Sequence, residues 1–155
     1  MKKMDETDFI RLTLENKLGM YRLAFSILRN ETDAEDAVSE TVLKAYEKLD
    51  KLRNTDKFKP WIMKILVNQA KTMLRGKNRI DLMADMEQLE MSFDNQTGEL
   101  WSVVSELEEE FRNVVILFYY EDMTTREIAK ALQIAEGTVK SRLSRAREKL
   151  KQKIG

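Results

Sequence analysis

Only one proline and five glycines interrupt this chain of 155 residues, too few for the many tight turns that a β-sheet protein needs. Residues that favour helices, namely Leu, Lys, Glu, Arg and Met, dominate the sequence instead. The sequence therefore predicts an all-α protein. A chain of this length forms one ordinary domain or two small ones, and each half alone holds only a thin core.

The composition excludes several classes of protein. The chain has no cysteine, which removes disulfides and thiolate metal sites, and no histidine, which removes the usual general base and zinc ligand. We expect no catalytic residue, no resident metal and no cofactor. The longest apolar stretches, such as 114–120, are far shorter than a membrane span, and the chain starts with charged residues rather than a hydrophobic signal. These features predict a cytoplasmic protein, and the missing residues remove much of the usual enzyme chemistry.

The formal net charge is zero, but the charges are sorted into blocks. Segment 57–79 has seven basic residues and no acidic one, whereas 80–110 has ten acidic residues and no basic one. Segment 138–155 has seven basic residues and one acidic residue. Two basic blocks separated by an acidic one indicate two sites for a polyanion. A single charged block could instead be the solvated face of a helix, with no ligand bound to it.

Apolar residues at three- and four-residue steps predict two long helices at the start of the chain. The first spans 9–28 and ends at Asn30 and Glu31. The second begins with a capping box formed by Thr32 and Glu35. The apolar stripes expected to be buried are Phe9, Ile10, Leu14, Leu18, Tyr21, Phe25 and Leu28 in the first helix, and Ala34, Val38, Thr41, Ala45, Leu49 and Leu52 in the second.

An acidic row lies on the other face of the second helix. It consists of Asp33, Asp36 and Glu40, and Lys44 follows Glu40 at the favourable four-residue spacing for an ion pair. The row is either a solvated face or a face that binds a partner, and the residues alone do not decide between these two.

A third helix is predicted over 60–75, because Pro60 suits its first turn and Gly76 lies just past its end. Phe58 and Trp61 stand beside lysines where the chain enters this helix. Aromatic rings interleaved with cations are suited to bind unstacked nucleotides. The alternative is that both rings are anchors in the core, and for Trp61 this alternative is the more common role. The expected buried stripe is Ile62, Ile65, Leu66, Gln69 and Met73, and Lys64, Asn68, Lys71 and Arg75 line another side.

The helical pattern weakens after Arg79. Segment 80–98 is interpreted as an acidic linker with room for a short helix around 82–90, and it separates a domain at 1–79 from a domain at 99–155. Two helices are expected at 100–107 and 109–120.

The end of the chain has the spacing of a helix-turn-helix. Thr124 and Glu127 form a second capping box, a short apolar face follows, and 133–136 connects to a final helix that ends at Ile154. A major groove accepts one such helix, arginine and lysine read guanine edges, and serine binds phosphates. A lipid or acidic protein surface is the alternative, but the helix has no Phe or Trp on its apolar side. Its outer face carries Lys140, Ser141, Ser144 and Arg145, flanked by Arg142 and Arg147.

Four segments resemble one known family. TTREIA at 124–129 and EGTVKSRLSRAREKL at 136–150 resemble region 4 of the extracytoplasmic-function (ECF) group of the sigma-70 family. DAEDAVSETVLKAY at 33–46 and FKPWIMKILVNQAK at 58–71 resemble region 2 of the same group. Both regions occur in the family's order, with a linker where the family has one.

The resemblance implies a specificity subunit of bacterial RNA polymerase, which directs promoter-specific transcription initiation and performs no chemistry itself. In this family the acidic helix binds a coiled coil on the largest catalytic subunit of the core polymerase. The third helix takes the −10 element as a single strand, and the final helix reads the −35 element as duplex promoter DNA. The implied polymerase-binding residues are Asp33, Asp36, Glu40 and Lys44; the −10 residues are Phe58, Lys59, Trp61, Lys64, Asn68, Lys71 and Arg75; the −35 residues are Thr138, Lys140, Ser141, Arg142, Ser144, Arg145 and Arg147.

Members of this group are commonly held inactive by a cognate anti-sigma factor, often membrane-anchored, and one is expected here. The acidic linker would run toward the RNA exit path and mimic RNA. Two residues depart from the pattern: Pro60 stands where many relatives have a small hydroxyl residue, and Ala135 stands where they often have proline.

Two other functions stay open on the residues alone. The chain could be a stand-alone helix-turn-helix regulator that binds operator DNA as a dimer. It could also be an enzyme that acts on nucleic acid with a metal on Asp33 and Asp36, although their spacing places them on an ordinary exposed helix face.

Overall fold

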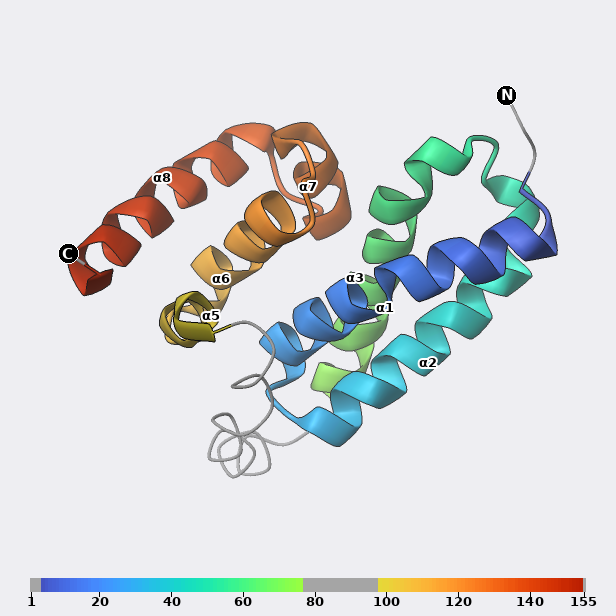
Figure 1. The fold of residues 1–155 in the computed structure, drawn as a ribbon, viewed down its shortest axis with the longest axis horizontal. Coiled ribbons are helices and arrows are strands. Elements are labelled where there is room, and N and C mark those ends of the chain that lie inside the picture. Colours follow the sequence, from blue (N-terminus) through green and yellow to red (C-terminus); the bar gives the residue numbers. More distant parts are fainter. Residues whose placement is uncertain (1–3, 77–97, 155) are drawn as a thin grey trace.

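The structure is a computed structural model that describes residues 4–76 and 98–154. Every regular element in these two ranges is a helix, which confirms the prediction of an all-α protein. The short helix expected around 82–90 lies outside the described residues. The α-helices are α1 (Glu6–Leu28), α2 (Glu31–Glu47), α3 (Phe58–Arg75), α5 (Gly98–Ser105), α6 (Glu109–Val115), α7 (Thr125–Leu132) and α8 (Glu136–Ile154) (Figure 1).

Helices α1, α2 and α3 pack against one another as an N-terminal unit. The predicted buried face of α1 is wrong in its first half, because Ile10, Leu14 and Leu18 are 58%, 66% and 47% exposed. In the second half of α1, Arg22 bonds to Glu121, and Ser26 bonds to Asn113 and Arg112 of the C-terminal unit. Polar side chains such as Arg22 and Ser26 are therefore buried in the second half of the helix.

The ends of α2 and α3 differ from the sequence prediction. The N-cap of α2 is Asn30, whose Oδ1 accepts the backbone N–H of Asp33 at 2.8 Å, so the predicted capping box at Thr32 is wrong. Asparagine is among the most favourable N-cap residues, which explains the earlier start. Helix α3 begins at Phe58, two residues before Pro60. Pro60 still lies in the first turn, where no intrahelical partner for its missing N–H is needed.

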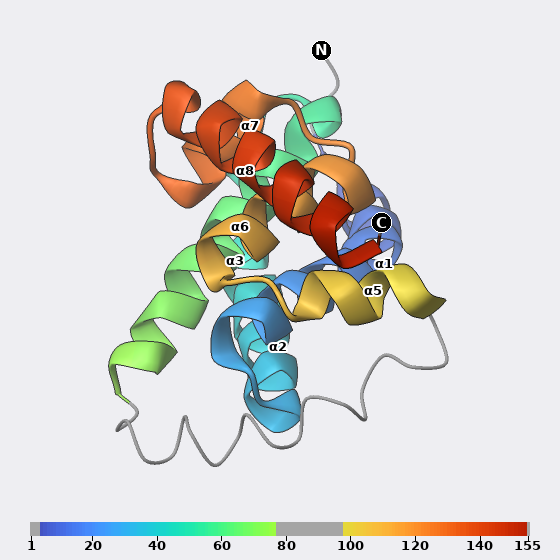
Figure 2. The same ribbon diagram turned by 90° about the vertical axis from the view of Figure 1, so that its left-hand side faces the viewer.

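The C-terminal unit consists of α5 to α8. Helix α6 continues into a five-residue π-helical segment, η4 (Ile116–Tyr120), before the helix-turn-helix of α7 and α8. The predicted capping box is present: Thr124 Oγ1 accepts the N–H of Glu127 at 3.1 Å, and Glu127 Oε1 accepts the N–H of Thr124 at 3.0 Å. Helix α8 lies across α6 and α7 (Figure 2). It buries Val139, Leu143 and Ala146 against them.

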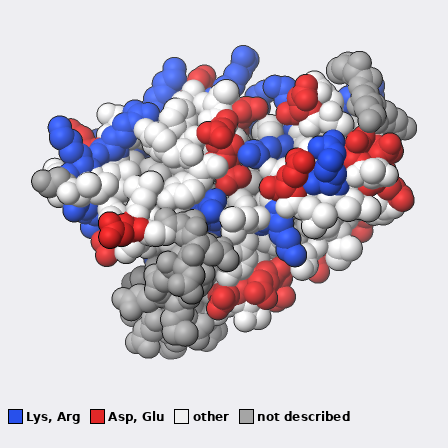
Figure 3. Space-filling view, in the orientation of Figure 1, with Lys and Arg blue, Asp and Glu red and all other residues white. Residues whose placement is uncertain are grey.

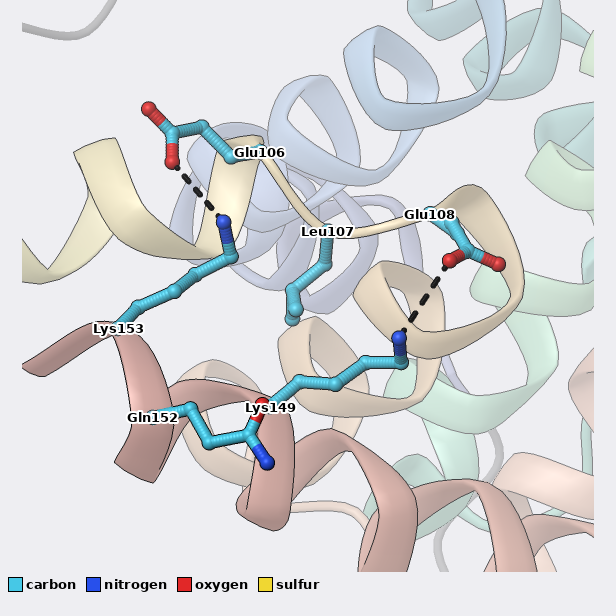
Figure 4. A pocket seen from close by; sticks show the side chains of 6 residues that line it. All are labelled: Glu106, Leu107, Glu108, Lys149, Gln152 and Lys153. Atoms are coloured by element: carbon cyan, nitrogen blue, oxygen red, sulfur yellow. Dashed lines mark hydrogen bonds and ion pairs between the residues drawn. The ribbon is translucent and has the colours of Figure 1, made fainter.

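Two ion pairs fasten the end of α8 to the connection between α5 and α6. Lys149 Nζ lies 3.5 Å from Glu108 Oε1, and Lys153 Nζ lies 3.3 Å from Glu106 Oε2, on the walls of a shallow pocket (Figure 4). All four side chains are at least 40% exposed, and exposed pairs contribute at most about 1 kcal/mol each. The two ion pairs thus help to orient the end of α8 without adding much stability.

The two units are in direct contact. Helix α7 packs on α3, and α6 with η4 packs on α1. Across the described ranges, no helix is long and apolar enough to cross a membrane.

Candidate nucleic-acid and polymerase interfaces

The outer face of α8 is the first candidate interface. Because Val139, Leu143 and Ala146 turn one side of this helix into the core, the other side points outward. Basic side chains line the outer edge of α8 (Figure 3). Exposed on this face are the predicted residues Lys140, Ser141, Ser144 and Arg145, and Lys140 Nζ lies 3.8 Å from Glu136 Oε2 in a surface ion pair.

Two arginines of the predicted −35 set are held by the protein itself. Arg147 Nε donates to the hydroxyl of Tyr119 at 2.6 Å, and its guanidinium lies 5.7 Å from the ring centre of Phe118. Arg142 Nη2 lies 3.9 Å from Glu110 Oε2, and Thr138 is half-buried near the start of α8. Among the described residues, Lys140 and Arg145 are the exposed cations of the set that have no such contact to another helix.

Helix α3 carries the second candidate interface. Lys64, Asn68, Lys71 and Arg75 are exposed, as the pattern predicts. Phe58 is 1% exposed and packs edge-on against Phe9, so its predicted stacking on a DNA base is wrong for this structure. The core-anchor alternative describes it instead. Trp61 is half-buried, with its ring centre 6.0 Å from that of Phe58.

The C-terminal unit contacts two of the predicted −10 residues. Lys59 Nζ donates to the backbone oxygen of Glu121 at 3.1 Å and lies 3.6 Å from its Oε1. Asn68 Oδ1 accepts a hydrogen bond from Gln133 Nε2 at 2.5 Å. These two contacts bring the connections on either side of α7 onto α3.

The acidic row on α2 is the third candidate interface. Asp36 and Glu40 are exposed, whereas Asp33 is half-buried and its backbone N–H donates to Oδ1 of Asn30 at the helix start. Lys44 turns toward α3, where its ammonium donates to Oε1 of Gln69. The exposed row is therefore acidic, while Lys44 fastens α2 to α3.

Sequence reasoning missed a buried polar network between the units. Arg112 Nε donates to Ser26 Oγ at 2.7 Å, its Nη1 donates to the Leu107 oxygen at 2.6 Å, and its Nη2 donates to the Ser26 oxygen. Ser26 Oγ in turn donates to Asn113 Oδ1 at 2.6 Å. Burial, reinforced by the nearby Arg29, lowers the pKa of Arg112 to about 9, so the guanidinium stays protonated at neutral pH.

A second cross-unit contact joins Arg22 and Glu121. Arg22 Nη1 lies 3.2 Å from Glu121 Oε2, and each side chain is only 7% exposed. The Arg22 guanidinium also lies 4.6 Å from the ring centre of Tyr120. The only sequence signal for either contact is that polar residues such as Ser26 and Asn113 stand beside apolar runs.

The fold and these surfaces define a class of protein: a two-unit helical DNA-binding protein with a helix-turn-helix and a separate exposed acidic row on α2. Comparison of the sequence with family models identifies the family. Residues 13–80 match the family described as Sigma-70 region 2, and residues 97–150 match Sigma-70, region 4.

Relatives with assigned roles are also sigma factors of RNA polymerase. The RNA polymerase sigma factor SigV of Bacillus subtilis is 35% identical over 152 residues, which cover 94% of this chain and 92% of that protein. The ECF RNA polymerase sigma factor SigW of the same organism is 26% identical and covers 99% of this chain and 92% of its own length. The chain therefore belongs to the ECF group of the sigma-70 family. It is an alternative sigma factor that directs transcription initiation, and its relatives are not enzymes in themselves.

Solved structures have the same fold. The sigma factor RpoE of Bartonella quintana, in complex with the anti-sigma factor NepR, superposes with a TM-score of 0.74 at 25% identity, covering 94% of this chain and 95% of that one. CnrH, in complex with the cytosolic domain of CnrY, superposes with a TM-score of 0.66 at 24% identity over 97% of this chain and 89% of that one.

Proposed function

We propose that this sigma factor reads the −35 element with α8, takes the −10 element on α3 and docks on core RNA polymerase through the acidic row of α2. The observation that carries the proposal is the exposed face of α8 within a helix-turn-helix. A helix of this kind enters the major groove, where arginine or lysine contacts to guanine discriminate between bases. Lys140, Ser141, Ser144 and Arg145 have the exposure that this role needs.

The −10 assignment rests on α3. Lys64, Lys71 and Arg75 give this helix a cationic side that attracts a DNA backbone, and the half-buried Trp61 offers part of a ring for stacking. The proposed units are 1–79 for the −10 element and polymerase, and 99–155 for the −35 element, joined by the acidic linker. The protein supplies binding and no catalytic step, because the polymerase performs nucleotidyl transfer.

The polymerase assignment rests on Asp36 and Glu40, which are exposed on one face of α2. A charged face of this kind steers association with a complementary partner surface. The Bartonella relative is bound to an anti-sigma factor, and we extend this type of partner to this chain. We expect such a partner to cover the DNA and polymerase surfaces. The proposed place of action is the cytoplasm, where the polymerase and the chromosome are.

The test is in vitro transcription with purified core polymerase on a library of randomised promoters. The proposal predicts transcripts whose templates share two sequence elements at a fixed separation, seen only when the sigma factor is added. Footprinting with the sigma factor alone forms the second arm, because a stand-alone regulator protects a specific site without polymerase. Specific protection without polymerase, combined with no change in start sites, would overturn the proposal in favour of that regulator.

A further inference from the structure

The first turn of α8 carries an acidic side chain on a face that is otherwise basic. Glu136 is the only acidic residue in the sequence from 136 to 147, which has four lysines and arginines. It is exposed and lies one turn before Lys140 and two turns before Ser144, so it belongs to the same outer face of the helix. A carboxylate here repels DNA phosphates, so any favourable contact with duplex DNA must come from a donor on a base.

Two neighbouring groups fix the position of this carboxylate. Thr125 Oγ1, at the start of α7, donates to Glu136 Oε2 at 2.7 Å, and Lys140 Nζ lies 3.8 Å from the same oxygen. Both contacts lie within the helix-turn-helix, where α8 begins beside α7 (Figure 1). Among the described residues, Oε1 of Glu136 forms no hydrogen bond or ion pair. This second oxygen is therefore available to accept a donor from outside the protein.

The four bases offer different groups to a carboxylate in the major groove. Guanine presents two acceptors and thymine presents an acceptor and a methyl group, so neither can donate to Glu136. Adenine has a donor beside an acceptor, whereas cytosine presents the N4 amino group alone. Cytosine is therefore the base that a carboxylate favours, and the acceptors of guanine are suited to Lys140. The N-terminal residues of a recognition helix are the ones that contact base edges.

The spacing of Glu136 and Lys140 suits two neighbouring base pairs. Four residues of an α-helix rise about 6 Å along its axis. This rise equals about two steps of a DNA duplex, each of about 3.4 Å. The ion pair keeps the two head groups side by side on one face of α8. A cytosine contacted by Glu136 and a guanine contacted by Lys140 therefore lie within about two base pairs of each other.

We propose that Glu136 is a specificity-determining residue of the −35 interface: its Oε1 accepts the N4 amino group of one cytosine, while Thr125 and Lys140 hold Oε2. Thr125 is a positioning residue in this arrangement, because it acts on the DNA only through Glu136. The inference rests on the proposed function, which assigns the −35 element to α8. It adds a preference for a cytosine–guanine pair, in one orientation, at one position of that element.

The test is transcription by holoenzyme from a promoter library in which only the −35 element is randomised. The unmodified protein should enrich cytosine at one position on one strand. Glu136→Gln should move that preference toward adenine, whose N6 and N7 groups pair with a glutamine amide, and Glu136→Ala should leave the position without a preference. We expect each variant to lose about fivefold to tenfold in discrimination for cytosine. The position should lie within about two base pairs of the one at which Lys140→Ala loses its preference.

Two further variants separate base reading from charge and from structure. Glu148→Gln is the matched control for lost charge, because Glu148 is an exposed acid on the same helix, about 18 Å further along. Glu136→Gln and Glu148→Gln should both bind duplex DNA somewhat more tightly, but only Glu136→Gln should change the base preference. Thr125→Val removes the hydroxyl that holds Oε2, so it should weaken the cytosine preference without a shift toward adenine.

Unchanged base preferences in both Glu136 variants overturn the proposal. An equal loss of output from every −35 sequence also overturns it, because a purely structural tie between α7 and α8 would produce that result. The same holds if the unmodified protein selects a −35 element without cytosine, or if the positions affected at Glu136 and Lys140 lie further apart. Failure of the proposed function is a different result, in which the unmodified protein selects no −35 element and no start site at all.

Discussion

Arg145 and Arg147 lie two residues apart on α8, and the structure predicts that their replacement by alanine has different consequences. Arg145 is exposed on the outer face of the helix. Arg147 donates to the Tyr119 hydroxyl at 2.6 Å and lies against the rings of Phe118 and Tyr119. We expect Arg145→Ala to weaken promoter binding and Arg147→Ala to weaken the fold.

The magnitudes follow from these contacts. A bidentate contact between arginine and guanine gives about 1–3 kcal/mol of discrimination, so Arg145→Ala should lower the affinity for a matched −35 element about 5- to 150-fold. The hydrogen bond and cation–π contact of Arg147 together contribute about 1–2 kcal/mol. For a protein of this size that loss lowers the unfolding midpoint by about 2–8 °C.

The assay pairs two measurements on both variants. Fluorescence anisotropy compares holoenzyme binding to a promoter selected from the library with binding to the same promoter carrying a scrambled −35 element, and calorimetry gives the unfolding midpoint. Arg145→Ala should lose the difference between the two DNAs and keep its midpoint. The opposite pattern would refute this expectation. In that pattern Arg147→Ala loses promoter discrimination and keeps its unfolding midpoint, whereas Arg145→Ala keeps its promoter discrimination.

Three further variants test a helix cap, the buried polar network and the acidic row. Thr124→Ala removes the capping box of α7 and should destabilise the protein by about 1 kcal/mol in urea unfolding, whereas an unchanged midpoint would show that the cap contributes nothing. Arg112→Met leaves the oxygens of Ser26 and Leu107 unpaired and should cost about 3 kcal/mol in the same assay, a loss that a stable variant would contradict. Asp36→Lys combined with Glu40→Lys should abolish co-purification with core polymerase while the unfolding midpoint is retained, and equal recovery of polymerase would count against the docking face.

Local signals allowed much of the fold to be predicted. The capping box at Thr124 and Glu127 was confirmed because both of its partners lie within one turn and need no tertiary context. The prediction at Thr32 failed because Asn30, two residues earlier, caps α2 first. The exposure of Ile10, Leu14 and Leu18 shows a different limit: apolar spacing identifies a helix but does not tell which of its apolar residues find a neighbour.

The contact between the units could not be predicted from sequence patterns. Arg22 and Glu121 are 99 residues apart, and Ser26 and Arg112 are 86 apart. Each looks like an ordinary polar residue on a helix or at its end, and only the packing of α6 and η4 on α1 brings them together. The basic blocks in the sequence indicated two nucleic-acid surfaces, but they did not indicate that one would be partly covered by the other unit.

We propose that two surfaces of this one chain contact two separate promoter elements while the chain is bound to polymerase. Because the sequence lacks cysteine, an iron chelate that cleaves DNA can be tethered at Thr72→Cys on α3 or at Glu148→Cys on α8, both exposed positions. In holoenzyme on a selected promoter, we expect the first label to cut near the −10 element and the second near the −35 element. Cleavage by both labels at one position, or the same cleavage without core polymerase, would contradict the account.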